Sequence, residues 1–289
     1  MPCRQPAHFY PPHLSPLPLQ EPAMSVSPVF ALITGASSGI GREIARAYAK
    51  RGVPLLLTAR REDRLHGLAD QLRSAVRVEV LPADLADPAA TEALATQIQR
   101  NGWTVGTLVN NAGYGVPGRY LHNDWATHAR FLQVMVTAVC ELTWRLLPMI
   151  RASGQGRILN VASFAALSPS ADRQTLYAAS KSFMLRFSES LALENADCGV
   201  KVCALCPGFA WSEFHDVTGT RNAMSALPAW AWLQADAVAE YGIAALERGQ
   251  VLAVPGWGYR LVNAALRLLP HAFALRMMAR GSHRVRPLD

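Results

Sequence analysis

The sequence has few charged residues and few cysteines, and both shortages restrict its chemistry. Charged side chains make up 17% of the 289 residues, against 51% hydrophobic residues, so the chain can bury a large core. The five cysteines are an odd number without a framework spacing, which indicates a reducing compartment. Cys203 and Cys206 form a CxxC, but no second pair or histidine cluster accompanies them. We therefore interpret "VKVCALCPG" as a buried strand and expect no bound metal.

The sequence also lacks a long apolar run suited to crossing a membrane. Residues 131–150 are mostly apolar, but Glu141 and Arg145 interrupt them, so a buried or subunit-facing helix fits better. Residues 1–28 are rich in proline and lack the positive start and apolar core of a signal peptide. We expect this extension to be disordered and the protein to be cytoplasmic, with Met24 as a candidate natural start.

Acidic residues are scarce towards the C-terminus, where much of the net charge of +7 resides. Six arginines follow Gly249, against the single acid Asp289. Within a tail that we assign to residues 257–289, residues 257–280 combine arginines with apolar positions at helical spacing, interrupted at Pro270. Such a stretch could lie on an anionic membrane surface, cap a cleft or pack in a dimer interface. No aromatic–basic platform accompanies it, so we expect no nucleic-acid binding.

Between Val29 and Gly256, short β-rich runs alternate with helical stretches. "VFALIT" is followed by "GREIARAYAKRG", and "PLLLTA" by "EDRLHGLADQLRSA". The alternation continues through a long helix near residues 125–150 to the short strand "VLAVPG". This order predicts parallel strands joined by right-handed crossovers, with helices on both faces of the sheet. The expected fold is α/β, a doubly wound parallel sheet in three layers that forms one domain over residues 29–256.

Glycines cluster in "LITGASSGIGREIA", where the first predicted strand turns into a helix. Gly35, Gly39 and Gly41 allow the backbone to turn sharply and to approach a pyrophosphate, whose charge is favoured at a helix N-terminus. A tight turn without a ligand would use the same glycines, but the position between a strand and a helix favours dinucleotide binding.

Further motifs follow in a fixed order: Asn110-Asn111-Ala112-Gly113, Ser163, Tyr177-x-x-x-Lys181, and Pro207-Gly208 after a later strand. Together with Thr34-Gly35-Ala36-Ser37-Ser38-Gly39-Ile40-Gly41, they resemble the short-chain dehydrogenase/reductase family over roughly residues 29–256. The resemblance implies a Rossmann-type sheet and hydride exchange between a nicotinamide coenzyme and a carbonyl or alcohol group. We also expect a homodimer or homotetramer.

The residues after the second predicted strand favour NADP(H) over NAD. "LLLTARRED" has Ala59, Arg60 and Arg61 where an acid would bind the ribose 2′-hydroxyl of NAD. A guanidinium can grip a 2′-phosphate bidentately, which fits Arg60 at the family's discriminating position, whereas Arg61 is interpreted as an ordinary solvated side chain. For Asp84, a helix N-cap role is as natural as a cofactor role. The other cofactor-binding residues that the resemblance implies are Gly35, Ser37, Ser38, Gly39, Ile40, Gly41, Leu85, Asn111, Ala112, Gly113, Tyr177, Lys181, Pro207, Gly208 and Ser212.

Tyr177 and Lys181 lie four residues apart, and hence on one face of a helix. A free phenol has a pKa of about 10, and moving it towards 7 needs roughly 4 kcal/mol in favour of the phenolate. A positive charge about 4 Å away supplies energy of that order in a partly shielded site. The resemblance implies that Tyr177 donates its proton to the carbonyl oxygen, that Ser163 hydrogen-bonds that oxygen, and that Lys181 also binds the nicotinamide ribose.

Two departures from the family pattern concern proton supply. Relatives usually carry an asparagine in the long helix that helps hold a water for proton relay to the lysine, whereas "QVMVTAV" has Met135. The interval between Ser163 and Tyr177 is also one residue longer than usual. We expect the hydride step to survive both departures, with slower proton supply or another route. Met135 leaves an alternative open, a catalytically weak NADP(H)-binding sensor or scaffold.

Bulky apolar residues dominate the segment after Pro207-Gly208. This segment is expected to cover the carboxyl ends of the strands, where open α/β sheets bind ligands. Its apolar members are Phe209, Trp211, Phe214, Met224, Leu227, Trp230 and Trp232. They favour a hydrophobic ketone or aldehyde, 3-oxoacyl- or steroid-like, although packing on the protein itself or on a partner subunit explains many of them equally well.

Overall fold

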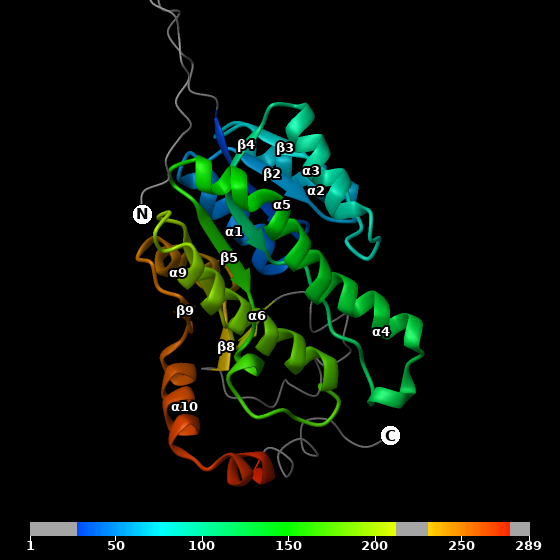
Figure 1. The fold of residues 1–289 in the computed structure, drawn as a ribbon, viewed down its shortest axis with the longest axis vertical. Helices are drawn as coiled ribbons and strands as arrows, with labels where there is room; N and C mark the ends of the chain where they lie inside the picture. Colours follow the sequence, from blue (N-terminus) through cyan, green and yellow to red (C-terminus); the bar gives the residue numbers. More distant parts are fainter. Residues whose placement is uncertain (1–27, 212–230, 278–289) are drawn as a thin grey trace, which may run out of the picture.

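A seven-stranded sheet forms the centre of the molecule. A computed structural model of the protein describes residues 28–211 and 231–277. The strands are β1 (Val29–Thr34), β2 (Leu55–Thr58), β3 (Val78–Val80), β4 (Thr104–Asn110), β5 (Arg157–Val161), β6 (Lys201–Leu205) and β9 (Leu252–Ala253). They lie in the order β3-β2-β1-β4-β5-β6-β9, and all neighbours are parallel (Figure 1). The strand order reverses between β1 and β4, the point at which such sheets bind ligands.

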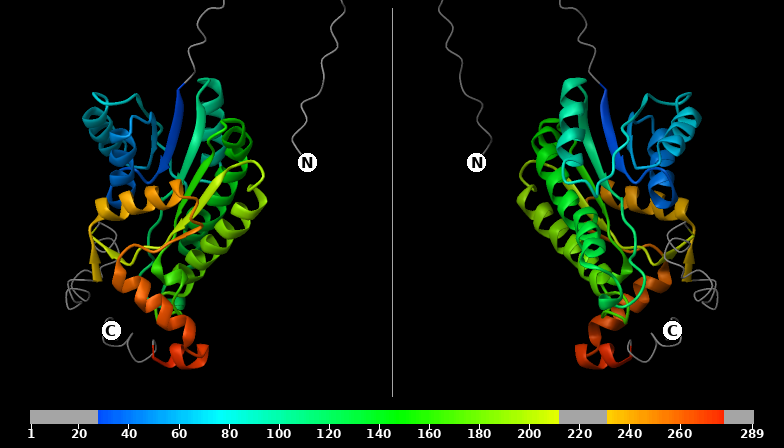
Figure 2. Two further views of the ribbon diagram at one scale, coloured as in Figure 1. Left: turned by 90° about the vertical axis from the view of Figure 1, so that its left-hand side faces the viewer. Right: turned by 90° about the vertical axis from the view of Figure 1, so that its right-hand side faces the viewer.

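Helices cover both faces of the sheet (Figure 2). One face carries α1 (Gly39–Lys50), α2 (Glu62–Leu72) and α9 (Ala235–Glu247), and the other carries α3 (Ala90–Arg100), α5 (Ala138–Ala152) and α6 (Thr175–Glu194). Alternate residues of β1 enter the two cores, Ile33 on the side of α1 and Leu32 on the side of α5. Strands covered on both faces must be apolar throughout, which explains runs such as "LLLT". The predicted doubly wound α/β fold is confirmed.

The predicted long helix near residues 125–150 contains an irregular turn. It consists of α4 (Trp125–Leu132), the π-helical turn η2 (Gln133–Thr137) and α5. Met135 lies in the middle of η2 and is fully buried. Single π-helical turns inside α-helices are frequent at functional sites. The methionine identified as a departure from the family pattern therefore stands where the helix itself is irregular.

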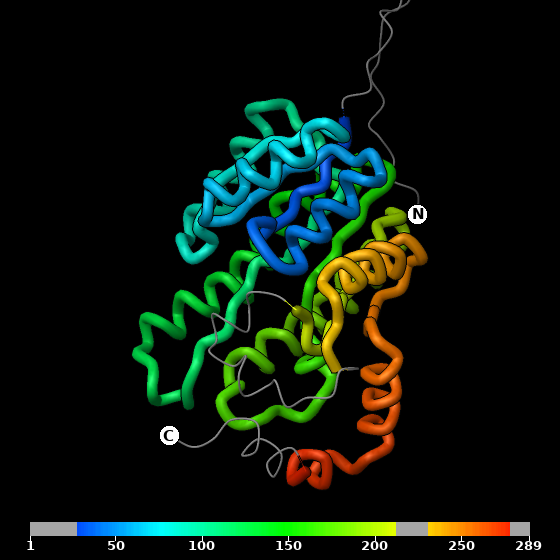
Figure 3. The backbone as a smooth tube through the Cα atoms, turned by 180° about the vertical axis from the view of Figure 1, so that it is seen from behind, coloured from blue at the N-terminus to red at the C-terminus, as the bar shows by residue number. Residues whose placement is uncertain are grey.

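Two further elements lie beyond the carboxyl ends of the strands. β7 (Phe209–Ala210) and β8 (Trp232–Leu233) pair as a separate two-stranded parallel sheet. The helix α10 (Trp257–Leu268) leaves the sheet edge after β9 and extends past the strand ends, and a further helical turn covers residues 271–277 (Figure 3). Ser212, Phe214, Met224, Leu227 and Trp230 lie outside the described residues, as do residues 1–27. Among the helices of residues 28–211 and 231–277, none has the length and apolar character needed to cross a bilayer.

Candidate active site

The glycine turn after β1 forms a cradle that side chains would fill. Gly35 has a φ of +66°, and a Cβ there would lie 2.8 Å from Asn111 Nδ2 and 2.9 Å from Ala112 Cα. A Cβ on Gly41 would overlap the carbonyl oxygen of Gly35. Both positions therefore require glycine, and the turn leads directly into the N-terminus of α1, where a pyrophosphate charge is favoured.

The Asn111-Ala112 segment is fixed to this turn across the β1–β4 switch point. Thr34 Oγ1 donates to the carbonyl of Val109 (3.2 Å) and accepts from the backbone amides of Asn111 (2.9 Å) and Ala112 (3.0 Å). In return, Asn111 Nδ2 donates to the carbonyls of Thr34 (2.9 Å) and Gly35 (3.2 Å). The structure thus brings together motifs more than 70 residues apart, as the sequence interpretation required.

Of the two arginines that follow β2, it is the second, Arg61, that contacts the glycine turn. Arg61 is half-buried, and its Nη2 donates to Ser38 Oγ (2.9 Å) and Ser37 Oγ (3.3 Å). Arg60 is exposed, beside the half-buried Tyr114. Sequence reasoning singled out Arg60 and interpreted Arg61 as solvated. The sequence feature that could have indicated a contact of Arg61 is the pair of serines in the glycine motif, because their hydroxyls accept from its guanidinium.

Asp84 lies in the loop after β3 and organises a local turn. Its Oδ1 accepts from the backbone amide of Ala86 (3.1 Å), and its Oδ2 lies 3.6 Å from Arg130 Nη2 of α4. The following helix α3 has Ala89 as its N-cap, so Asp84 does not cap a helix. The neighbouring Leu85 is buried.

Tyr177 and Lys181 share one face of α6, as their spacing predicted. Lys181 is only 5% exposed, and its Nζ donates to the carbonyl of Val161 (2.8 Å) at the end of β5. The same Nζ lies 5.9 Å from the centroid of the Tyr177 ring. Burial lowers the pKa of Lys181 from 10.5 to about 8, because the charged form loses its hydration. The site therefore holds a lysine that can change protonation near neutral pH.

Ser163 and the Pro207-Gly208 turn meet at the carboxyl ends of β5 and β6. Ser163 precedes the short helix η3 (Phe164–Ala166), and its Oγ accepts from the backbone amide of Ala165 (3.2 Å). The next amide, Phe164 N, donates to the carbonyl of Pro207 (2.8 Å). Cys206 is fully buried beside Lys181, and burial raises the pKa of its thiol to about 12. The interpretation of this CxxC segment as a buried strand is confirmed by β6.

Met135 packs directly beneath the Asn111-Ala112-Gly113 segment. A Cβ added to Gly113 would lie 2.9 Å from Met135 Sδ. A thioether is at most a weak hydrogen-bond acceptor, so this side chain fills space beneath Gly113 without supplying the hydrogen bonds of an amide.

A chain of buried amides and hydroxyls beneath the site escaped sequence reasoning. Asn110 Nδ2 donates to Asn160 Oδ1 (2.9 Å) and to Thr143 Oγ1 (3.1 Å), and Asn160 Nδ2 donates to Ser188 Oγ (2.8 Å). These contacts tie β4, α5, β5 and α6 together. The side chain of Asn110 is therefore used in the core. The sequence feature that could have indicated this chain is Asn160, a polar residue in the buried part of the strand "RILNV".

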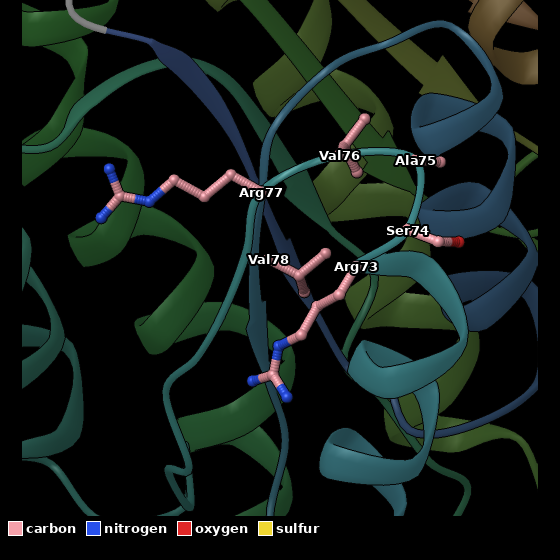
Figure 4. Close-up of a pocket in the computed structure, with 6 residues that line it drawn as sticks. All are labelled: Arg73, Ser74, Ala75, Val76, Arg77 and Val78. Carbon is pink, nitrogen blue, oxygen red and sulfur yellow. The ribbon is translucent and has the colours of Figure 1, made fainter.

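Two hollows on the described surface can be compared with the predicted site. One lies beside α6 and α4 and is lined by Val116, Tyr120, His128, Phe131, Leu176 and Tyr177, among others. The other is formed by residues 73–78 between α2 and β3, at the amino end of the sheet and away from every predicted site residue (Figure 4). Only the first is connected with the predicted catalytic residues.

Comparison with known proteins defines the class of this site. The short chain dehydrogenase family model matches residues 29–222, two thirds of the chain. A sulfoacetaldehyde reductase of Chromohalobacter salexigens is 36% identical over 196 residues, which cover 67% of this chain and 77% of the relative. The protein belongs to the short-chain dehydrogenase family.

Solved structures of similar proteins extend the match beyond the family model. A short-chain dehydrogenase from Sphingobium yanoikuyae in complex with NADPH is 30% identical, with a TM-score of 0.73 over 83% of this chain and 94% of that one. A bulky-bulky ketone specific alcohol dehydrogenase from Comamonas testosteroni is 27% identical, with a TM-score of 0.69 over 83% and 92% of the two chains. Both likenesses bear out the Rossmann-type fold.

Proposed function

We propose that the protein is an NADP(H)-dependent reductase of carbonyl compounds. The observation that carries the proposal is the buried Lys181 beside Tyr177 on α6, at the same sheet edge as the cradle of Gly35 and Gly41. The cradle, Asn111 and the Pro207-Gly208 turn would hold the cofactor, which supplies or accepts the hydride when bound. The cofactor of the Sphingobium neighbour supports NADP(H).

The chain's own residues would handle the proton. Ser163 hydrogen-bonds the carbonyl oxygen and orients it, and Tyr177 donates the proton to that oxygen as negative charge develops. Lys181 stabilises the phenolate that remains, because a cation close to the ring favours the charged form. Its own pKa of about 8 lets it return a proton to Tyr177 near neutral pH.

The decisive experiment is NADPH oxidation with a panel of ketones and aldehydes. We expect turnover with the wild type, and a loss of about 100-fold or more in Tyr177→Phe, since general acid catalysis is worth roughly 10²–10⁴-fold. NADPH affinity of this variant should stay within a few fold. Binding of NADPH without turnover of any compound would instead favour the catalytically weak sensor or scaffold.

Both arginines after β2 are proposed to select the 2′-phosphate. Arg61 already contacts the serines of the glycine turn, and Arg60 is exposed at the neighbouring position. Arg60→Ala and Arg61→Ala should each raise the KM for NADPH about tenfold or more while changing that for NADH much less, because charge-assisted bonds to phosphate are lost. Equal changes for both cofactors would contradict the assignment.

A hydrophobic carbonyl substrate, 3-oxoacyl- or steroid-like, agrees with the aromatic groups that the structure describes near the strand ends. Trp211 and Trp232 stack with ring centroids 4.3 Å apart, and Phe209 lies 5.9 Å from Trp232. The ketone-specific neighbour supports this class, whereas the sulfoacetaldehyde reductase favours a small anionic one. Competition between a long-chain ketone and sulfoacetaldehyde in the same assay separates them.

The proposed homodimer or homotetramer has candidate contacts on α5 and α6. Trp144 and Phe183 are both exposed there. Burial of such aromatics between subunits is favoured by the apolar area removed from water. We also retain the division into an extension (1–28), a catalytic domain (29–256) and a tail (257–289) as a proposal.

We further propose that α10 contacts an anionic membrane surface. Leu261 and Leu268 are 64% and 85% exposed, and Arg260 and Arg267 flank them. No acid occurs among residues 257–277. A helix with such an apolar face and basic flanks suits a lipid interface.

Sedimentation with phosphatidylcholine vesicles, with and without phosphatidylglycerol, tests this contact. Leu261→Asp/Leu268→Asp should abolish binding to the anionic vesicles. The matched control is Leu193→Asp, an equally simple change at an exposed leucine of α6. Equal sedimentation of all three proteins would dismiss the lipid contact.

A further inference from the structure

The side chain of Tyr259 returns from α10 to the core of the molecule. It is 6% exposed, although most residues of α10 are exposed. Its hydroxyl donates to the carbonyl of Ala231 (2.6 Å) and accepts from the backbone amide of Phe209 (3.0 Å). One hydroxyl therefore joins two chain positions that are 22 residues apart, at the start of the paired strands β7 and β8.

The ring of Tyr259 packs against the residues that frame the site. A Cβ on Gly208 would overlap the ring, so the glycine of the Pro207-Gly208 turn is needed for this contact. The ring also lies 5.0 Å from the ring of Phe164, the residue after Ser163. Because Phe164 N donates to the carbonyl of Pro207, the ring bears on both partners of that hydrogen bond.

We propose that Tyr259 is a positioning residue of the active site. It holds the Pro207-Gly208 turn, and through Phe164 also Ser163, in the arrangement that the proposed function uses. Tyr259 lies beyond residue 222, where the match to the family model ends, and within the segment interpreted from sequence as a tail. In that case Tyr259 acts in the active site although it lies in the segment proposed as the tail.

The surroundings of Tyr259 favour a side chain that keeps its hydrogen bonds and its position. Burial raises the pKa of its phenol, so the hydroxyl stays protonated over the physiological range and keeps donating to Ala231. The hydroxyl uses its donor and one acceptor position, while the ring contacts Gly208 and Phe164. Removing the hydroxyl would take this partner from the amide of Phe209 and from the carbonyl of the buried Ala231.

Tyr259→Phe in the full chain tests the proposal, because it keeps the ring and removes only the hydroxyl. Tyr48→Phe is the matched control: Tyr48 is equally buried, in α1, and its hydroxyl has no hydrogen-bond partner in the part of the chain that the structure describes. The first measurement is amide hydrogen exchange of peptides that cover residues 207–211 and 231–233. We expect exchange at Phe209 to quicken about tenfold in Tyr259→Phe and to stay unchanged in the control.

The second measurement separates positioning from a purely structural role. NADPH affinity, followed by nicotinamide fluorescence without substrate, should fall about three- to tenfold in Tyr259→Phe at a temperature where the protein is fully folded, the range that one lost hydrogen bond corresponds to. Tyr48→Phe should bind NADPH like the wild type.

Two results would overturn the proposal. One is unchanged exchange at Phe209, and the other is faster exchange with wild-type NADPH affinity, which would make Tyr259 merely structural. The role of Tyr259 in positioning Ser163 for catalysis rests on the proposed function. Neither measurement, however, needs turnover of a substrate. A protein that reduces no carbonyl compound would therefore refute the proposed function while leaving these two readouts intact.

Discussion

The nucleotide end and the C-terminal end of this molecule are built in different ways. At the nucleotide end, the side chains of Thr34 and Asn111 bond to backbone atoms of each other's segments, and Thr34, Gly35 and Asn111 all belong to short sequence motifs. At the C-terminal end, the Pro207-Gly208 turn is held by the side chain of Tyr259, which belongs to no recognised motif. The comparison teaches that contacts between residues of short motifs can be expected from the sequence. A contact made by one side chain from a distant segment, such as that of Tyr259, becomes visible only in the tertiary structure.

The largest effect is expected from closing the glycine cradle. In Gly41→Ala the new methyl group would overlap the carbonyl of Gly35, which is backbone and cannot move aside cheaply. We expect the unfolding free energy to fall by about 1–3 kcal/mol, as for other overpacked sites. NADPH affinity should fall well over 100-fold, measured by fluorescence titration.

A control glycine outside the glycine turn tests whether the effect of Gly41→Ala is specific to that turn. A Cβ on Gly67, in α2, would meet nothing within 4 Å. Gly67→Ala should therefore raise the unfolding free energy by about 0.5–1 kcal/mol, because alanine is the better helix former. NADPH affinity should not change. Similar losses in both variants would refute the special role of the nucleotide end.

An intermediate effect is expected at Lys181, which is bonded to the end of β5. Its folded-state pKa of about 8 lies below the ordinary 10.5, so the unfolded chain binds more protons between these values. The stability of the wild type should therefore rise with pH from about 8 to 10.5 and carry the full penalty at pH 7. Lys181→Met should be more stable at pH 7 by about 2 kcal/mol, the pKa penalty less one lost hydrogen bond.

Urea unfolding at several pH values measures this difference. The gap between Lys181→Met and the wild type should shrink steadily as the pH approaches 10.5. The variant should at the same time lose carbonyl reduction. A gap that is constant with pH would mean that burial of the ammonium does not limit stability.

The smallest effect is expected at Met135, which packs under Gly113 between the two ends. Met135→Asn introduces the amide that the family pattern implies and should raise kcat by no more than about threefold, because Lys181, with a pKa of about 8, can already return a proton near neutral pH. Steady-state rates from pH 6 to 9 check this. A tenfold rise would show that proton supply limits the wild type, and an unchanged rate would show that the relay is not needed.

Sequence patterns predicted the fold and the strand–turn–helix at the glycine motif, because both depend on local rules. Alternating strands and helices dictate a parallel sheet, and the Gly35–Gly41 motif dictates a strand–turn–helix. The prediction of which long side chain contacts the glycine turn was incomplete. Arg60 was favoured, but Arg61 contacts Ser37 and Ser38, since adjacent residues after a strand point in different directions.

The sequence by itself determined the layered α/β fold and the family, and it placed Tyr177 and Lys181 on one face of a helix. Only the tertiary structure decided that Lys181 is buried enough to have a pKa of about 8, that Asn110, Asn160 and Ser188 form one buried chain, and that Tyr259 reaches the site from α10. The physical reason is that helical spacing is a local property of the backbone. Burial and long-range hydrogen bonds exist only after distant segments pack together.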